Sequence, residues 1–261
     1  MFLNFTRSGS PDAPAIFFLH GMAMGQWMWF DQTQYFADYD CYNVDLPGHG
    51  GSNQIEWCSF EHSADCVAQL IKHETSGKPV YLVGMSLGAI VGLHVLAQHP
   101  ELINRAVLTG ALAERPPRWI ISLQGGILSV LLPTTFGKKL FARMLHLPPD
   151  AMPYYTESIS ALSMPSFKRI VSQLADYSPP KGQGLINVPT LFVTGEKDIA
   201  VNRNAVQKLA QEVPEAVGVY APRLHHGWNG EDPALFNAMT RAWIEELPLP
   251  KSLIPAGSAP T

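Results

Sequence analysis

Short apolar runs alternate with amphipathic stretches along most of the chain. Residues 59–73 place Phe60, Ala64, Val67 and Ile71 on one face of a helix. Runs that are predominantly apolar throughout are typical of strands buried on both faces of a parallel sheet. The alternation predicts βαβ units, helices on both faces of the sheet, and ligands bound beyond the carboxyl ends of the strands. The runs are AIFFLH from Ala15, CYNVDL from Cys41, PVYLVG from Pro79, RAVLTG from Arg105 and PTLFVTG from Pro189.

This alternation stops between residues 113 and 187, where Pro and Gly are frequent and apolar patches at 119–123, 126–132 and 140–145 predict short helices. We interpret residues 113–187 as a helical cap inserted into an α/β core made of residues 1–112 and 188–247. The cap holds eight Lys and Arg against four Asp and Glu, whereas the whole chain has a net charge of -4. The Pro-rich and Ala-rich segment 248–261 predicts a frayed, flexible tail.

The composition excludes several classes of protein. A hydrophobic content of 46% with 15% charged residues is typical of a folded enzyme, and the acidic net charge disfavours a nucleic-acid partner. No apolar run approaches the roughly 18 residues of a membrane span. The three cysteines lack metal or redox spacing, and no motif requires a metal or cofactor. Without the pattern of a secretory signal in its first residues, the chain is expected to be cytoplasmic.

The segment Gly84-Met85-Ser86-Leu87-Gly88 joins a predicted strand to a predicted helix over residues 89–97. This G-x-S-x-G pattern between strand and helix is typical of a serine nucleophile held on a sharp turn. The turn needs glycine because a side chain at either end would collide with the neighbouring strand or helix. Ser86 is therefore the candidate nucleophile.

A serine nucleophile needs a histidine base that a carboxylate orients. His225 and His226 follow the last predicted strand, 217–220, and precede a predicted helix from about residue 233 to 245. This position after the acid fits the chain order of nucleophile, acid and base on such a scaffold. Asp198, at the end of TLFVTGEKD, is the candidate acid, and Glu114 is the alternative.

Two backbone N–H groups are candidates to bind an oxyanion. One belongs to Leu87, directly after the nucleophile, and the other to Met22, in the loop that follows AIFFL. In the same loop His20 either braces the backbone through its side chain or acts in catalysis. The candidates for an apolar substrate pocket, which could instead simply pack, are Met24, Trp27, Met85 and Trp228.

Five motifs in this order resemble the α/β-hydrolase family, and specifically its small lidded serine esterases of carboxylesterase type. They are HGMAMGQWMW from His20, DLPGHGGS from Asp45, GMSLG from Gly84, GEKD from Gly195 and HHGWNGEDPALF from His225. The resemblance implies an α/β-hydrolase fold: a mostly parallel central sheet, flanking helices and a helical cap after the sixth strand. It also favours His226 as the base, because the family histidine precedes an acid by five residues and a proline by seven, here Glu231 and Pro233. The chain departs from the family at His225, where glycine is usual, so exchanged roles stay open.

The expected function is hydrolysis of carboxylic esters or thioesters of small to medium apolar acyl groups through an acyl-enzyme, with Ser86, Asp198 and His226 as catalytic residues. The alternatives are a carbon–carbon bond hydrolase, lyase or perhydrolase on the same scaffold, and a ligand receptor with a weakly active triad. The basic cap also suggests docking of an acidic acyl carrier protein, as in the biotin-synthesis esterases that the chain resembles in outline; solvated basic side chains explain the charge more simply.

Overall fold

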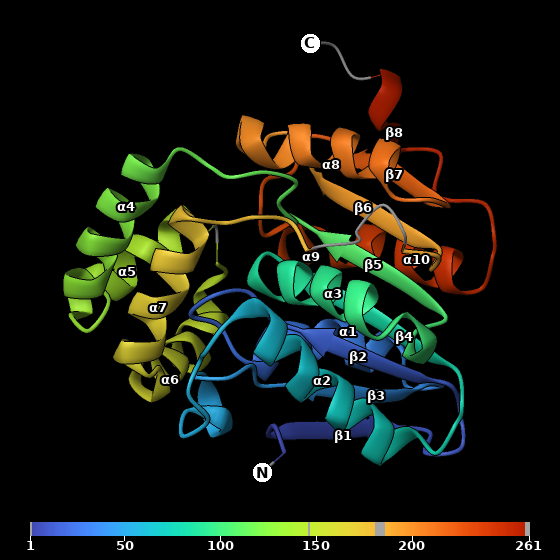
Figure 1. Cartoon of the computed structure of the whole chain (residues 1–261), viewed down its shortest axis with the longest axis horizontal. Helices are drawn as coiled ribbons and strands as arrows, with labels where there is room; N and C mark the ends of the chain where they lie inside the picture. Colours follow the sequence, from blue (N-terminus) through green and yellow to red (C-terminus); the bar gives the residue numbers. More distant parts are fainter. Residues whose placement is uncertain (1, 146, 181–185, 259–261) are drawn as a thin grey trace.

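The computed structural model describes residues 2–145, 147–180 and 186–258, and its strands form one eight-stranded sheet in the order β1-β3-β2-β4-β5-β6-β7-β8 (Figure 1). The six inner strands are parallel, while β1 and β8 pair antiparallel at the two edges. Each predicted apolar run overlaps one of the parallel strands. The strands are β1 (Phe5–Gly9), β2 (Ala15–Leu19), β3 (Asp40–Val44), β4 (Val80–Met85), β5 (Arg105–Thr109), β6 (Thr190–Gly195), β7 (Ala216–Ala221) and β8 (Ile254–Pro255).

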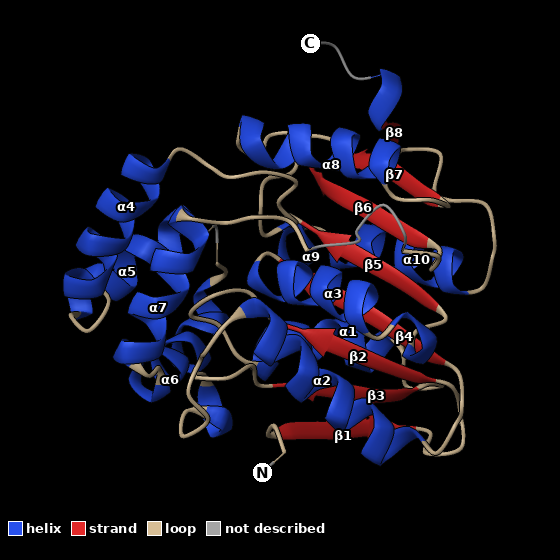
Figure 2. Cartoon of the chain, viewed as in Figure 1, coloured by secondary structure: helices blue, strands red, loops and turns tan. Residues whose placement is uncertain are grey.

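Helices cover both faces of this sheet (Figure 2). Along β2, Phe17 and Leu19 join the apolar cluster under α2, α3 and α8, whereas Ile16 and Phe18 join the cluster under α1 and α10. This alternation follows from the two-residue period of a strand. The helices of the core are α1 (Phe30–Tyr35), α2 (Phe60–Thr75), α3 (Leu87–Gln98), α8 (Ala200–Glu212), α9 (Trp228–Glu231) and α10 (Pro233–Ile244), and 3-10 turns lie at Gln26–Trp29, Gly50–Ser52, Pro100–Leu102, Pro149–Ala151 and Ala256–Ser258.

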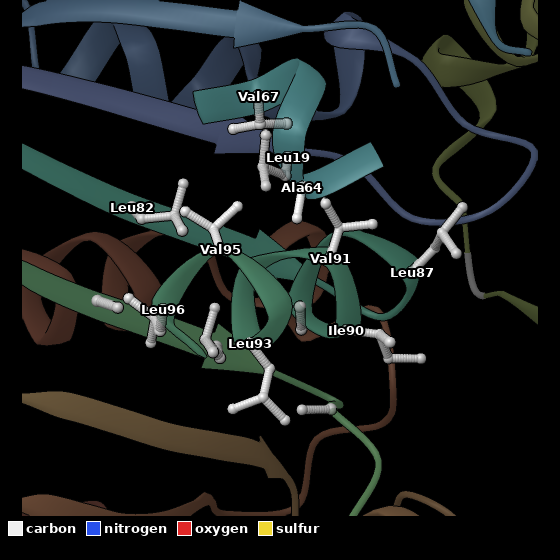
Figure 3. Close-up of a cluster of buried hydrophobic side chains, with 14 of the residues drawn as sticks. Leu19, Ala64, Val67, Leu82, Leu87, Ile90, Val91, Leu93, Val95 and Leu96 are labelled. Carbon is white, nitrogen blue, oxygen red and sulfur yellow. The ribbon is translucent and has the colours of Figure 1, made fainter. Parts of the chain in front are cut away.

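Helix α3 is buried almost completely, with ten of its twelve residues inaccessible. Figure 3 shows it between α2, which supplies Ala64 and Val67, and the sheet, which supplies Leu82. A helix enclosed on all sides cannot shift without opening cavities. The fold therefore fixes the N-terminus of α3, and with it the turn that carries Ser86.

Four helices lie between β5 and β6 in the segment predicted as a cap, and we call them the cap helices: α4 (Arg118–Leu131), α5 (Thr135–Met144), α6 (Met152–Ala161) and α7 (Met164–Ala175). They pack around an apolar cluster of their own that includes Tyr155, Ile159 and Phe167 and extends to Met24 of the core. The resemblance implies a cap after the sixth strand. In this chain the cap helices follow the fifth strand, because only one strand, β1, precedes the parallel strands β2 to β7. Residues 181–185 at the predicted end of the cap, including Lys181, lie outside the described residues.

The segment 248–261, predicted as a frayed tail, includes an edge strand in the part that the structure describes. Ile254 and Pro255 form β8 on the edge of β7, and Leu253 and Ala256 are buried there. Gly218 makes room for this packing, since a Cβ at that position would lie 3.0 Å from the Cβ of Ala256. Residues 259–261 lie outside the described residues.

Among the described residues, no helix combines the length and the apolar character needed to cross a membrane.

We predict that Gly88→Ala lowers the free energy of unfolding by about 3 kcal/mol. A Cβ at Gly88 would lie 2.1 Å from the main-chain oxygen of Leu19 in β2, which cannot retreat from the centre of a sheet. Urea-induced unfolding of the purified variant measures the loss.

The matched control is Gly126→Ala in α4, where no atom lies within 4 Å of the added methyl group. This change should stabilise by about 0.5–1 kcal/mol, because alanine restricts the unfolded chain and favours the helix. Equal stability of the two variants would contradict the close contact between α3 and β2.

Candidate active site

The loops after β2, β4, β6 and β7 meet at one edge of the sheet. Figure 2 shows the arrowheads of β2, β5 and β6 pointing toward the cap. Strands β2 and β4 are direct neighbours, with Leu19 opposite Gly84, although β3 comes between them in the chain. The chain therefore adds β3 on one side of β2 and then β4 on its other side. Open α/β sheets typically bind ligands in the crevice at such a point, where the strand order reverses.

Ser86 sits on the sharp turn between β4 and α3, with φ 53° and ψ -111°. This left-handed φ is costly for a residue with a side chain and persists only where the surrounding fold enforces it. The two glycines of the motif allow the turn: a Cβ at Gly84 would lie 2.5 Å from the oxygen of Gly88, and a Cβ at Gly88 would meet Leu19. The steric role predicted for both glycines agrees with this geometry.

Asp198 and His226, predicted as acid and base, lie side by side. The Nδ1 atom of His226 is 2.7 Å from Oδ2 of Asp198. The carboxylate is buried, and it also accepts hydrogen bonds from the hydroxyl of Thr194, the amide of Asn202 and the backbone N–H of Ile199. With its Nδ1 atom turned toward this carboxylate, the imidazole keeps Nε2 for a second partner.

The surroundings of Asp198 favour its ionised form. Burial alone raises the pKa of the carboxyl group, but the adjacent imidazole of His226 and the hydrogen bonds from Thr194 and Asn202 outweigh it and hold the pKa below its usual value. A permanently ionised carboxylate at this point holds the imidazole in the Nδ1–H tautomer and stabilises it when it gains a proton.

Ser86 and His226 line the same cavity, which has a volume of about 430 Å³. Ser86 N–H donates to the oxygen of Thr109 at 2.8 Å, and the imidazole lies against the next residue, Gly110, where a Cβ would be 2.7 Å from its Cε1 atom. In the described part of the chain no hydrogen bond joins the two side chains; such bonds often lengthen in the absence of substrate. The apolar residues that line the cavity are Met22, Leu87, Ile90, Leu112, Pro116, Pro117, Ile120, Ile121, Leu174, Ile199 and Val201.

The alternative base and the alternative acid have other partners. His225 donates its backbone N–H to Glu231 at 3.0 Å, and its Nδ1 atom lies 2.9 Å from the same carboxylate. Glu114 is exposed and pairs with Lys208 at 3.0 Å. In this arrangement Glu231, the acid five residues after His226, holds the other histidine and the loop between β7 and α9.

The loop after β2 lies beside the nucleophile, since a Cβ at Gly21 would be 3.7 Å from the Cβ of Ser86. Two buried histidines hold this loop. His20 Nε2 accepts from the N–H of Leu46 at 3.0 Å, so its Nδ1–H donates to the oxygen of Gly21 at 2.8 Å. His49 likewise accepts from the N–H of Ala23 at 3.2 Å through Nε2.

These two histidines orient the peptide that carries the predicted oxyanion donor. The carbonyl and N–H of a trans peptide point in opposite directions, so anchoring the Gly21 oxygen on His20 turns the N–H of Met22 away from that imidazole. Within the described residues, the N–H groups of Met22 and Leu87 form no hydrogen bond. Burial lowers the pKa of both imidazoles, that of His49 to about 3, so both are neutral near pH 7.

The four candidate pocket residues fall into two groups. Met24, Trp27 and Met85 line a second cavity of about 170 Å³ that also reaches Gly227, next to His226. Trp228 is instead buried completely, with its ring 4.8 Å from that of Phe236 and its Nε1–H donating to Thr109. Trp228 thus anchors the loop of His226 to the core and does not line the cavity of about 170 Å³.

Sequence reasoning did not identify Thr194, Asn202 and Gly110. Thr194 and Asn202 hold the carboxylate of Asp198, and Gly110 leaves space for the imidazole of His226. The spacing of Asn202, four residues after Asp198 and on the first turn of α8, could have indicated the contact. No pattern around Thr194 or Gly110 separates them from other residues at strand ends.

Comparison with known proteins identifies the family of the fold. A family model described as the alpha/beta hydrolase fold matches residues 14–228. The chain belongs to the alpha/beta hydrolase fold family. The match extends from β2 to the loop of His226, so it includes every loop described above.

Several known proteins are similar to this chain over most of its length. The (E)-2-((N-methylformamido)methylene)succinate hydrolase of Acinetobacter baylyi is 24% identical, covering 88% of this chain and 90% of the relative. The 2-succinyl-6-hydroxy-2,4-cyclohexadiene-1-carboxylate synthase of an Enterobacter species is 24% identical, covering 93% and 98%. Among solved structures, the enol-lactonase of Burkholderia xenovorans has a TM-score of 0.78 at 18% identity, covering 93% and 96%.

We predict that Asp198→Asn lowers kcat by about 10⁴-fold while the variant stays folded, because the amide cannot stabilise a protonated imidazole. Glu114→Gln, on the exposed alternative acid, should keep kcat within about twofold of the wild type. Steady-state hydrolysis of an activated ester measures both, with circular dichroism to verify folding. The reverse ranking would transfer the role of the acid to Glu114.

Proposed function

We propose that this protein is a serine hydrolase that cleaves carboxylic esters or thioesters of neutral, apolar acyl groups. The observation that carries the proposal is the cavity of about 430 Å³ to which Ser86 and His226 both belong. In the described residues its lining includes no Asp, Glu, Lys or Arg, and its polar side chains besides these two are Gln124 and Asn202. An apolar cleft with few polar groups favours an apolar ligand and disfavours a charged one.

In the first step of the proposed reaction, the hydroxyl of Ser86 attacks the carbonyl carbon of the ester while Nε2 of His226 takes the hydroxyl proton. The carbonyl oxygen becomes an oxyanion, and the N–H groups of Met22 and Leu87 are the candidate donors to it. Support for this role comes from their lack of other partners and from the start of α3 at Leu87, since the N-terminus of a helix favours negative charge. The C–O bond then breaks, and His226 returns its proton to the departing alkoxide.

In the second step, a water molecule attacks the acyl group on Ser86. His226 takes a proton from the water, and after the tetrahedral intermediate collapses it returns the proton to Ser86, which releases the carboxylic acid. Asp198 stays ionised throughout and orients the imidazole. The depressed pKa of its carboxyl group supports this role.

The substrates of the curated relatives suit this cavity less well. The names of the Acinetobacter and Enterobacter enzymes specify a succinate and a carboxylate, both of them anions near neutral pH. A buried anion requires a paired cation or several donors, and the lining named above includes neither Lys nor Arg. We therefore favour uncharged acyl groups, while carbon–carbon bond hydrolysis, lyase or perhydrolase chemistry and ligand reception are the alternatives that the experiments below separate. The free cysteines Cys41, Cys58 and Cys66 are compatible with the cytoplasmic location that we propose.

We predict that a fluorophosphonate probe labels the wild-type protein and that Ser86→Ala abolishes both labelling and hydrolysis of p-nitrophenyl esters. Only an activated serine hydroxyl forms a stable phosphonyl adduct under mild conditions. Labelling is measured by the mass of the intact protein. Persistent labelling of Ser86→Ala would refute the nucleophile, and labelling with single-turnover kinetics alone would favour a receptor.

We predict that Ile121→Trp shifts the preference toward short acyl chains, because the larger side chain fills the cavity beside Ser86. The ratio of kcat/KM for a p-nitrophenyl octanoate over the acetate should fall about tenfold.

Val217→Trp provides the control, because it makes a comparable change at an exposed position of β7 that does not line the cavity. Its ratio should equal that of the wild type. Faster turnover of an acidic ester or of a neutral dienone than of every simple ester would contradict the proposed substrate class.

A further inference from the structure

Helices α4 and α5 expose seven large apolar side chains to solvent. Three of them, Trp119, Val130 and Phe136, are 71%, 70% and 69% exposed. The two helices lie at the edge of the cap that faces away from the sheet (Figure 1). We call these side chains the outer cap face: Trp119, Leu123, Ile127 and Val130 of α4 and Phe136, Leu140 and Met144 of α5.

The spacing of these residues makes the exposure systematic. On α4 they recur at intervals of four, four and three residues, and on α5 at intervals of four, so each set occupies one side of its helix. The other sides of α4 are also largely apolar: Ile121 lines the cavity of Ser86, and Gly125 packs against Val171 of α7. A helix that is apolar on nearly all sides is normally buried, so the outer cap face lacks a covering partner.

Basic side chains lie on the same two helices, and one of them, Arg118, pairs with Asp176 at 3.3 Å. Residues 118–144 include Arg118, Lys138, Lys139 and Arg143 but no Asp or Glu. Lys139 and Arg143 are exposed, and each lies three residues after an apolar member of the α5 row. Long basic side chains beside an exposed apolar row can extend toward anions while their stems lie along the apolar surface.

We propose that the outer cap face binds the surface of an anionic phospholipid bilayer. The seven apolar side chains would enter the acyl boundary, and Lys139 and Arg143 would reach the phosphate groups. At about 1.5 Å per residue, the 14 residues of α4 extend only about 21 Å, so this helix would lie in the plane of the interface. Trp119, near the start of α4, is the residue type that such interfaces favour.

Two other occupants fit the same surface less well. In an isologous dimer each patch meets its own copy, so pairing through this face would bring two sets of the same cations together. An acidic acyl carrier protein would match the cations but would leave a row of large apolar side chains against polar groups. A bilayer surface matches both kinds of side chain, because its phosphate groups can bind the cations and its acyl boundary can bury the apolar side chains.

This proposal concerns binding and does not depend on the proposed reaction. It does have a geometric link to the candidate active site, because α4 forms both the outer cap face and, through Ile120 and Ile121, a wall of the cavity. A helix with its side chains is about 10 Å thick. Docking would therefore bring lipid within the thickness of one helix from the cavity that Ser86 lines.

The experiment measures flotation with vesicles of phosphatidylcholine and phosphatidylglycerol, mixed about two to one, together with tryptophan emission. Trp119 is the most exposed large apolar side chain, whereas Trp29, Trp57 and Trp228 are buried completely. We expect the wild type and Ser86→Ala to float with these vesicles and their emission to shift to the blue. Trp119→Phe should keep binding but lose the shift.

The matched pair of variants is Leu123→Ser on α4 and Leu247→Ser after α10, whose leucines are 57% and 54% exposed. Leu123→Ser should weaken vesicle binding about tenfold, and Leu247→Ser should leave it unchanged. The double variant Lys139→Glu with Arg143→Glu should lose at least about fivefold for each cation on anionic vesicles. On pure phosphatidylcholine this double variant should differ little from the wild type.

Absence of flotation, or equal binding by the leucine pair, would overturn the proposal. Sedimentation velocity provides the competing outcome, since a dimer that Leu123→Ser dissociates, without vesicle binding, would assign the face to a second copy. Binding of an acyl carrier protein that the double charge variant abolishes, again without vesicle binding, would assign it to an acidic protein.

Discussion

Helix α3 lies so close to β2 that a Cβ at Gly88 would be only 2.1 Å from the main-chain oxygen of Leu19. This approach lets the turn between β4 and α3 rise beside the loop that follows β2. The strained backbone of Ser86, the N-terminus of α3 and the N–H group of Leu87 all depend on it, because each would move relative to the loop of Met22 if α3 were displaced from the sheet. Burial of α3 between α2 and the sheet supplies the packing energy that holds this geometry.

Much of the fold could be predicted from the pattern of residues. The buried parallel strands have continuous apolar runs, and each predicted run forms such a strand. The edge strands have no such signal: β1 is mostly exposed and polar, and β8 is a two-residue bridge within a Pro-rich segment. Edge strands depend on backbone hydrogen bonds to a neighbour that the local sequence does not specify.

The candidate site likewise includes residues that could be predicted from the sequence and residues that could not. Ser86, Asp198 and His226 follow from a motif and from chain order, and the structure brings the last two within 2.7 Å of each other; their catalytic roles stay a prediction. The supports of these residues could not be predicted, because they come from packing. Thr194 contacts the carboxylate of Asp198 only because β6 ends beneath it, and His49 reaches Ala23 only because two loops cross beside β2.

The pair of buried imidazoles beneath the loop of Met22 sets an acid limit on the fold that is separate from the chemistry at His226. An unfolded chain protonates both His20 and His49 below about pH 6.5, whereas burial in the folded protein lowers the pKa of both imidazoles, that of His49 to about 3. Their contribution to stability is therefore complete above pH 6.5 and declines as the solution is acidified, by up to about 1.4 kcal/mol per pH unit for each ring. Acidification thus lowers the stability of the fold that holds the loop of Met22, so the protein should tolerate alkaline conditions better than acidic ones.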